Sequence, residues 1–295
     1  MLEQQLVNGF TLGLIYALIA VGYTMVYGVI ELINFAHGEV YMFGAFLCMM
    51  FLTVFGAPLI VAVLLSMACC ALMGVLLDVV AYRPLRNAPR LAALITAIGM
   101  SIFLQNLAMI IWGSRPLPFV KQALPAFFKN TALSFGDVNI SWMQMAIYIA
   151  AVAMMISLNL VITRTRIGTA MRALAQNRVC ASLMGINVNR VISFTFALGS
   201  GLGAMAGIMV SMFYNTMYPT MGYNAGVKAF AAAVLGGIGS VPGAMFGGIV
   251  LGIAETLGAG YVSSPYRDGV AYAVMILVII LRPSGLLGRA VTEKA

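Results

Sequence analysis

The sequence predicts an all-α integral membrane protein, a polytopic helix bundle, on three observations. Of the 295 residues, 62% are hydrophobic and 8% are charged, whereas a water-soluble domain carries about 25% charged residues. The apolar residues form long runs, and at roughly 20 residues per crossing the chain has room for about eight to ten transmembrane helices. These runs do not alternate apolar and polar residues, as the strands of a membrane barrel would. A soluble enzyme, a disordered chain and a nucleic-acid-binding protein are therefore excluded.

The apolar runs define the elements in order. Six are predicted as helices at residues 6–30, 33–55, 58–80, 91–112, 142–162 and 191–214. A Gly-rich region at 223–258 follows, and a final run covers 269–281. No stretch between them is long enough for a soluble domain, so residues 1–295 are expected to form one transmembrane domain.

The Gly-rich region is expected to hold two helices with a break between them. Its sequence GGIGSVPG (236–243) contains five Gly or Pro residues in eight, and both residue types interrupt helices. Unwound backbone is tolerated within a membrane only where protein or water satisfies its polar groups. Some helices of the bundle are therefore predicted to be broken.

The basic residues orient the bundle. Eleven of them occupy two loops, 82–90 and 163–190, and the C-terminal tail: Arg83, Arg86, Arg90, Arg164, Arg166, Arg172, Arg178, Arg190, Arg282, Arg289 and Lys294. Segments on the opposite side hold four, Arg115, Lys121, Lys129 and Arg267. The positive-inside rule assigns the first side to the cytoplasm. The loop 113–141 is then external, the C-terminus is cytoplasmic, and the net charge of +8 reflects topology rather than binding of nucleic acid.

The two halves of the chain share short similarities. FTLG (10–13) is similar to FALG (196–199), and MFGA (42–45) is similar to MFGG (245–248). Such matches also arise by chance in an apolar chain, so both an internal two-fold repeat and coincidence remain open. If the repeat is real, paired broken helices mark the transport path. Glycines at 199, 203 and 207 favour close packing of one helix against its neighbours.

Charged residues within the apolar runs need an explanation, because a charge at mid-membrane costs about 2.5–3.5 kcal/mol. Asp78 is expected to be solvated beside Arg83 at a cytoplasmic end. Lys228 and Glu255 are expected either to reach water from the outer ends of their helices or to have a function.

A denser polar group occupies nine residues: Glu31, Asn34, His37 and Glu39 around Gly38. Two interpretations remain open. Either Asn34 caps a helix at a cytoplasmic turn with both glutamates in water, or the group lines the inner mouth of a polar pathway. The sequence contains no nucleophile–base pair, and its single histidine cannot build a metal site alone. We therefore expect no catalytic residue, no metal and no cofactor bound by this chain.

The loop 163–190 is too charged to cross the membrane, yet it is rich in helix formers from Ala170 to Met184. Thr169 is expected to cap this amphipathic helix, and Gly185 to end it in the left-handed conformation. The helix either lies on anionic lipid or docks against a protein, and its alanine-rich apolar side favours docking. No Walker-type phosphate loop is present, so a separate ATPase subunit is the expected partner.

Several motifs occur in one order along the chain. They are INFAHGEVYM (33–42), IGMSIFLQN (98–106), GTAMRA (168–173), LMGI (183–186), KAF (228–230) and VLGGIGSVPGA (234–244). Together they resemble the bacterial branched-chain amino acid ABC permeases of the high-affinity leucine/isoleucine/valine type, over about residues 8–288. GTAMRA and LMGI of this chain resemble the loop by which permeases of that family are coupled to their ATPases.

The resemblance implies the permease subunit of an ATP-binding cassette importer in the bacterial inner membrane. It implies a second homologous permease subunit, two cytoplasmic ATPases that bind the ATP, and a periplasmic binding protein that delivers leucine, isoleucine or valine. The implied coupling residues are Gly168, Arg172, Ala173, Leu183 and Gly185, with Arg172 and Ala173 at the contact. The implied residues of the translocation path or its gates are Asn34, His37, Glu39, Gly236, Gly237, Gly239 and Pro242.

Two alternatives remain. Related permeases carry urea or short amides, although Phe35 and the pair at 40–41 favour the amino acid members. A self-contained ion-coupled carrier, with Glu255 or Glu39 as its coupling carboxylate, is the alternative from another functional class.

Overall fold

The structure is a computed structural model that describes residues 1–86, 88–119, 128, 130–136, 138–261, 263–282 and 285–288. Four of the basic residues used to predict the topology, Lys121, Lys129, Arg289 and Lys294, lie outside the described residues. The predicted all-α polytopic bundle is confirmed, and seven of its described helices are long and apolar enough to cross a membrane.

The bundle is built from nine helices of the described chain. They are α1 (Leu2–Ile30), α2 (His37–Thr53), α3 (Leu59–Leu77), α4 (Arg90–Trp112), α5 (Trp142–Arg164), α8 (Val188–Tyr214), α9 (Met221–Gly236), α10 (Val241–Tyr261) and α11 (Arg267–Leu281). A π-helical turn, Asp78–Tyr82, continues α3. Two short helices, α6 (Arg166–Gln176) and α7 (Arg178–Leu183), connect α5 to α8.

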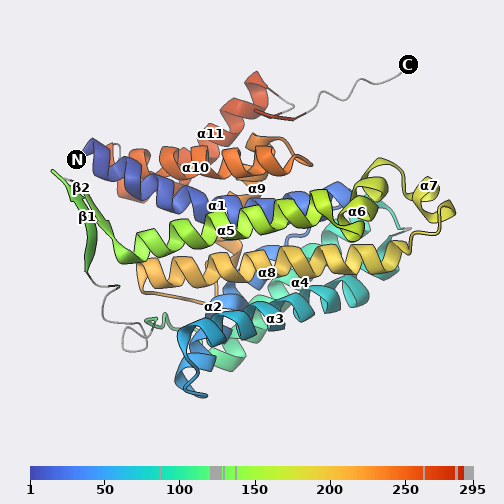
Figure 1. Cartoon of the computed structure of the whole chain (residues 1–295), viewed down its shortest axis with the longest axis horizontal. Helices are drawn as coiled ribbons and strands as arrows, with labels where there is room; N and C mark the ends of the chain where they lie inside the picture. Colours follow the sequence, from blue (N-terminus) through green and yellow to red (C-terminus); the bar gives the residue numbers. More distant parts are fainter. Residues whose placement is uncertain are drawn as a thin grey trace.

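Two ends of the molecule can be distinguished in Figure 1. The short helices α6 and α7 lie at one end, and the hairpin of β1 (Thr131–Phe135) and β2 (Val138–Ser141) lies at the other, with the N-terminus. Arg86 donates to the side chain of Asn189 at the start of α8, so the loop after α3 lies at the same end as α6 and α7. We call this end, with residues 83–86 and helices α6 and α7, the basic end, and the opposite end the hairpin end.

The hairpin was not predicted. β1 and β2 pair antiparallel within the segment expected to be an external loop. The backbone of Asn139 exchanges two hydrogen bonds with the side chain of Gln4, which fixes the hairpin to the start of α1. Ser141 then caps α5 through a reciprocal pair of hydrogen bonds with Gln144.

Helices α2 and α9 begin inside the bundle rather than at its surface. The imidazole of His37, the first residue of α2, lies against Gly22, where a Cβ would come within 2.5 Å of Nε2. Gly22 precedes the end of α1 by eight residues, about 12 Å along the helix. The chain therefore turns back after Ile30 and runs into the protein before α2 starts.

The segment 215–220 returns into the bundle in the same way after α8. Its Met217 forms a two-hydrogen-bond bridge with Leu117. The first turn of α9 then meets the first turn of α2, since a Cβ on Gly222 would lie 2.7 Å from the carbonyl oxygen of Gly38. Two half-length helices thus begin side by side within the protein.

These features form an inverted repeat. Helix α1 packs against α8, α9 and α10, and α8 packs against α1, α2 and α3. Exchanging α1 with α8, α2 with α9 and α3 with α10 preserves these pairings, while α1 and α8 run in opposite directions between the two ends. The similarity of FTLG to FALG fits this correspondence. The match of MFGA to MFGG does not, because these segments lie in α2 and α10.

The predicted break in the Gly-rich region is confirmed. Helix α9 ends at Gly236 and α10 begins at Val241, while Gly237 and Gly239 adopt positive φ angles of 101° and 93°. The amide of Leu287 donates to the carbonyl of Gly236, so protein satisfies part of the freed backbone.

The glycines of α8 allow the close packing that their spacing predicted. A Cβ on Gly207 would lie 1.9 Å from the carbonyl oxygen of Tyr41, so α8 and α2 are in backbone contact. Gly199 faces the backbone of Gly22 on α1 in the same manner.

Candidate functional site

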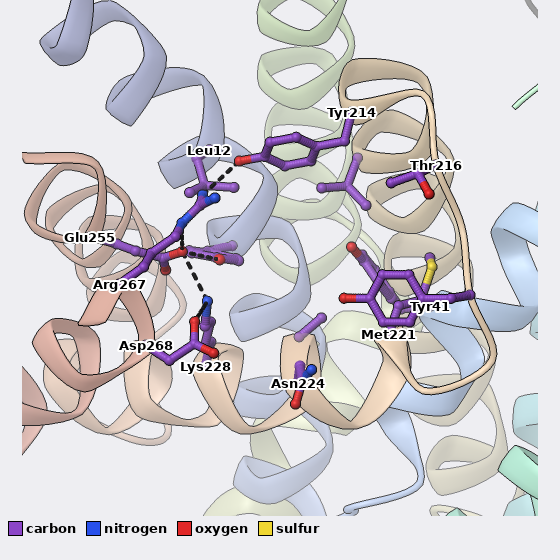
Figure 2. A pocket seen from close by; sticks show the side chains of 14 residues that line it. Leu12, Tyr41, Tyr214, Thr216, Met221, Asn224, Lys228, Glu255, Arg267 and Asp268 are labelled. Carbon is purple, nitrogen blue, oxygen red and sulfur yellow. Dashed lines mark hydrogen bonds and ion pairs between the residues drawn. The ribbon is translucent and has the colours of Figure 1, made fainter. Parts of the chain in front are cut away.

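A cavity of about 360 Å³ lies among α1, α2, α8, α9, α10 and α11 (Figure 2). This volume is at the lower end of the range of small-molecule sites, roughly 300–1,000 Å³. Four tyrosines line it, Tyr16, Tyr41, Tyr214 and Tyr218, together with four charged residues, Lys228, Glu255, Arg267 and Asp268. We call these four charged residues the charged cluster.

Glu255, on α10, is the centre of the charged cluster. Its side chain is fully buried, and one carboxylate oxygen, Oε1, accepts three hydrogen bonds. The donors are Lys228 Nζ at 2.9 Å, Arg267 Nε at 2.5 Å and the Tyr16 hydroxyl at 3.2 Å. The other oxygen, Oε2, is buried without a hydrogen-bond partner. One oxygen of this carboxylate therefore accepts every hydrogen bond and the other accepts none.

Lys228 bridges two carboxylates, because its Nζ also lies 2.6 Å from Asp268 Oδ1. The residue is 7% exposed. The expectation that Lys228 and Glu255 reach water separately is wrong: they are buried and paired with each other. Pairing is the less costly solution, since a buried charge needs an opposite charge and hydrogen bonds.

The two walls of the cavity differ in character. The charged cluster occupies one wall, and Tyr41, Met221 and Thr216 project from the opposite one (Figure 2). Tyr214 lies between them, accepting a 2.6 Å hydrogen bond from Arg267, whose guanidinium also lies 5.5 Å from the Tyr214 ring centroid. Such a cation–π contact further stabilises a partly buried cation.

Sequence reasoning missed most of this site. The sequence marks Lys228 and Glu255 as charges within apolar runs, whereas nothing in it distinguishes the four tyrosines from other aromatic residues of the helices. Arg267 and Asp268 follow one another at the start of α11 and balance the charges of the other two. The equal number of positive and negative residues in these distant segments was the signal that could have predicted their pairing.

The structure buries Asn34, His37 and Glu39 within the bundle. They are 2%, 1% and 0% exposed. Asn34 accepts a 2.8 Å hydrogen bond from Tyr82, and Ala36 rather than Asn34 occupies the N-cap of α2. The interpretation of a solvated helix cap is therefore wrong for Asn34 and Glu39. Glu31 alone of this group is exposed.

Glu39 and His37 each combine one satisfied atom with one unpartnered atom. Glu39 Oε1 accepts from Ser101 on α4 at 3.0 Å, and its Oε2 is buried without a partner. His37 donates to the carbonyl of Ile19, packs edge-on against the ring of Tyr23, and leaves Nε2 without a partner. These groups lie where α2 and α9 begin. Among the described residues, no three His, Cys, Asp or Glu side chains form a group that could hold a metal ion.

The three glycines predicted to belong to the translocation path lie away from the cavity and from the start of α2. Gly236, Gly237 and Gly239 form the end of α9 and the turn to α10, and Pro242 is the second residue of α10. Gly239 approaches Gly28 near the end of α1, toward the basic end. This turn does not line the cavity of the charged cluster.

The predicted amphipathic helix is two helices. Thr165, not Thr169, caps α6, since its hydroxyl accepts from the amide of Gly168. Asn177 interrupts the helix and caps α7 by accepting from the amide of Cys180 at 3.0 Å. Asn is a strong N-cap residue, which explains the break. Gly185 has a φ of 82°, in the left-handed conformation predicted for it.

Of the predicted coupling residues, Gly168 is buried, Ala173 is half-buried, and Arg172, Leu183 and Gly185 are exposed. Arg172 donates to the carbonyl of Ile162 and to the Thr169 hydroxyl, which ties α6 to the end of α5. Gly168 is buried where a Cβ would lie 2.3 Å from the same carbonyl oxygen, and Ala173 is half-buried. Leu183, in contrast, is 80% exposed.

The exposed apolar surface continues around α7. Val179 and Met184 are exposed with Leu183 at the tip of the basic end. Arg178 donates to the carbonyl of Val29 at 3.2 Å, which ties α7 to the end of α1. Burial lowers the pKa of the Arg178 guanidinium from its usual value, and the nearby Glu31 opposes this change.

A third buried carboxylate lies at the basic end. Asp78 is fully buried, pairs with Arg86 at 2.5 Å through Oδ1, and accepts from the Ser193 hydroxyl at 2.6 Å through Oδ2. The expectation that Asp78 is solvated beside Arg83 is therefore wrong. We call Asp78, Arg86 and Ser193 the Asp78 cluster.

Comparisons with known proteins agree with the helical architecture. Residues 5–279 match the family described as "Branched-chain amino acid transport system / permease component". The high-affinity branched-chain amino acid transport system permease proteins BraD of Pseudomonas aeruginosa and LivH of Escherichia coli K12 are each 46% identical, over 99% of this chain and 97% of their own. A chain of PsaBC from Streptococcus pneumoniae, in complex with a Fab, has a similar fold, with a TM-score of 0.50, 11% identity, and coverage of 94% of this chain and 91% of its own.

Proposed function

Because this chain belongs to the family of branched-chain amino acid permeases, we propose that it is the membrane subunit of an ATP-binding cassette importer for leucine, isoleucine and valine. The observation that carries the proposal is the 46% identity to two such permeases over nearly the whole chain. In this importer the chain hydrolyses no ATP itself and lies in the inner membrane of the cell.

The proposed partners are a second, homologous permease subunit, two ABC ATPases and a periplasmic amino-acid-binding protein. The positive-inside rule supports a cytoplasmic basic end and C-terminus. The apolar tip formed by Val179, Leu183 and Met184 supports ATPase docking, because exposed apolar patches mark protein interaction sites. Arg172 is exposed and also holds α6 against α5, so in this proposal it positions α6 at the ATPase contact.

Copurification from membranes that express the whole system tests the ATPase partnership. The tagged chain should bring down an ATPase, and Leu183→Glu should abolish this association, because it places a charge in an apolar contact. The matched control is Leu133→Glu, the same change at a 42% exposed residue of β1 at the hairpin end, which should retain the ATPase. An ATPase that stays bound to the Leu183 variant would contradict docking at this tip.

Reconstitution tests the importer itself. Leucine uptake into proteoliposomes should require the ATPase, ATP and the binding protein. Uptake of leucine by this chain alone, driven by an ion gradient, would overturn the proposal in favour of a self-contained carrier. Leucine uptake that fails while urea or a short amide is transported would assign a different substrate.

A further inference from the structure

We propose that the cavity beside the charged cluster binds the zwitterionic head group of the transported amino acid within this subunit. The ammonium group would contact Glu255, the carboxylate would contact Arg267, and the aliphatic side chain would extend toward Tyr41 and Met221. The identity of the ligand rests on the proposed function, whereas the site itself rests on the geometry of the cavity.

The unpartnered oxygen of Glu255 supports the position of the ammonium group. Glu255 lines the cavity and is fully buried, yet Oε2 has no hydrogen-bond partner while Oε1 has three. A buried acceptor without a donor is unfavourable, and a charged donor gives a stronger hydrogen bond than a neutral one. An α-ammonium group in the cavity supplies such a donor once the carboxylate rotates to present Oε2.

Arg267 supports the position of the carboxylate. Glu255 and Tyr214 engage two of its five N–H donors, at 2.5 Å and 2.6 Å. A planar guanidinium matches the geometry of a carboxylate and binds it through parallel hydrogen bonds. The side chain is 32% exposed and lines the cavity, so a ligand can reach it.

The net charge of the charged cluster favours a zwitterion over an ion. Lys228 and Arg267 balance Glu255 and Asp268, so the site is neutral before binding. A neutral zwitterion keeps this balance, whereas an amine or a carboxylic acid anion adds one uncompensated charge. An uncompensated charge in a buried site is strongly unfavourable.

The shape of the cavity favours an aliphatic side chain. Met221 and Tyr41 lie opposite the charged cluster, and Val210 and Tyr218 add further apolar and aromatic surface to the cavity. A ligand that is charged at one end and apolar at the other therefore meets a matching wall on each side (Figure 2).

Protection of an introduced cysteine tests the site without relying on transport. Asn224 is exposed and lines the cavity, so Asn224→Cys, in a background with the exposed Cys180 changed to Ser, provides a labelling position. The assembled importer in nanodiscs, without ATP, is treated with a methanethiosulfonate reagent. Leucine at ten times its apparent Kd should slow labelling about tenfold, because about a tenth of the sites remain empty.

Two analogues distinguish recognition of the whole head group from hydrophobic filling. The acid 4-methylpentanoate lacks the ammonium group of leucine, and 3-methylbutylamine lacks its carboxylate. Neither should slow labelling at the same concentration. Leu133→Cys in the hairpin, in the same background, is the control whose labelling leucine should not change. Unchanged labelling of Asn224→Cys with leucine, or equal protection by all three compounds, would overturn the proposal.

Variants of the cavity give a second test through transport. Ala225 lines the cavity, so Ala225→Phe should fill it and abolish leucine uptake. The matched control is Ala146→Phe in an apolar cavity of about 270 Å³ between α3, α5 and α8, which should retain uptake. Glu255→Gln removes the charge that faces the ammonium group and should raise the KM for leucine about tenfold or more.

A structural role for the charged cluster predicts a different pattern. If the cluster only joins α9, α10 and α11, exchanging the partners in the double variant Lys228→Glu with Glu255→Lys should restore the uptake lost in each single variant. A binding site should remain inactive in the double variant. If the wild-type importer takes up leucine but leucine does not protect the Asn224→Cys importer from labelling, this site is refuted and the proposed function stays intact. If the wild-type importer takes up no leucine, the proposed function is refuted.

Discussion

Asp78 and Glu255, two of the three fully buried carboxylates among the described residues, are satisfied in different ways. Asp78, at the basic end, has one hydrogen-bond donor on each oxygen, Arg86 and Ser193. Glu255 has three donors on one oxygen, no partner on the other, and a cavity beside it. A carboxylate with both oxygens satisfied ties helices together, whereas an unevenly satisfied one beside a cavity leaves a position that a ligand can fill.

The two clusters also differ in the role that we expect for each part of the molecule. The Asp78 cluster fixes the end of α3 to α8 close to α6 and α7, the region proposed to receive the ATPase. The charged cluster joins α9, α10 and α11 around an accessible space. We expect the first cluster to matter for stability and the second for substrate.

The largest expected effect follows from removing the carboxylate at the basic end. Asp78→Ala leaves Arg86 without its ionic partner in a largely buried position, where its side chain is 13% exposed. Breaking a buried pair by removing one partner costs about 3–5 kcal/mol. The melting temperature of the purified importer, followed by intrinsic fluorescence in detergent, should therefore fall strongly.

A second variant of Asp78 provides the control. The double change Asp78→Ala with Arg86→Met replaces both charges by apolar groups and should recover most of the lost stability, since apolar replacement of a buried pair is often neutral. If the double variant is as unstable as the single one, the loss comes from packing rather than from the unpaired charge.

An intermediate effect comes from removing one neutral donor from each carboxylate. Ser193→Ala leaves Asp78 Oδ2 buried without a donor, which costs about 1–3 kcal/mol. Tyr16→Phe removes one of three donors from Glu255 Oε1, where Lys228 and Arg267 remain, so less than about 1 kcal/mol should be lost. Thermal unfolding of the two variants in parallel measures the difference, and equal losses would remove the distinction between the clusters.

The helices themselves were predictable because their signal is local. Apolar runs of sufficient length and the Gly and Pro residues of the α9–α10 break are read directly from neighbouring residues. The returning segment before α2 was not, because Leu32, Ile33 and Phe35 are as apolar in an extended segment as in a helix. The break at Asn177 had a local signal, its capping side chain, which the run of helix formers on both sides concealed.

The site required information that a single segment does not contain. Lys228 and Glu255 were recognisable as charges in an unfavourable place, but their partners come from α11. Pairing of α9 with α10 and α11 is a tertiary contact, so solvation at the helix ends was the simpler interpretation and was wrong. The same reason explains why Asp78 was assigned to Arg83 rather than to Arg86 and Ser193.

The smallest expected effect concerns the rim of the charged cluster. The side chain of Asp268 is 56% exposed, although its Oδ1 lies 2.6 Å from Lys228. Water can replace this carboxylate and Glu255 still pairs with Lys228, so Asp268→Asn should lower the stability by at most about 1 kcal/mol. The change in melting temperature should shrink further at high salt, because exposed pairs are screened.

The outcome of Asp268→Asn decides how open the cavity is. Glu3→Gln, a change at an exposed carboxylate at the start of α1, provides the baseline for losing one surface charge. A destabilisation close to that baseline agrees with a solvated rim through which a ligand can enter. A loss as large as that of Asp78→Ala would mean that Lys228 needs both carboxylates to remain buried, and that the charged cluster is a closed structural tie like the one at the basic end.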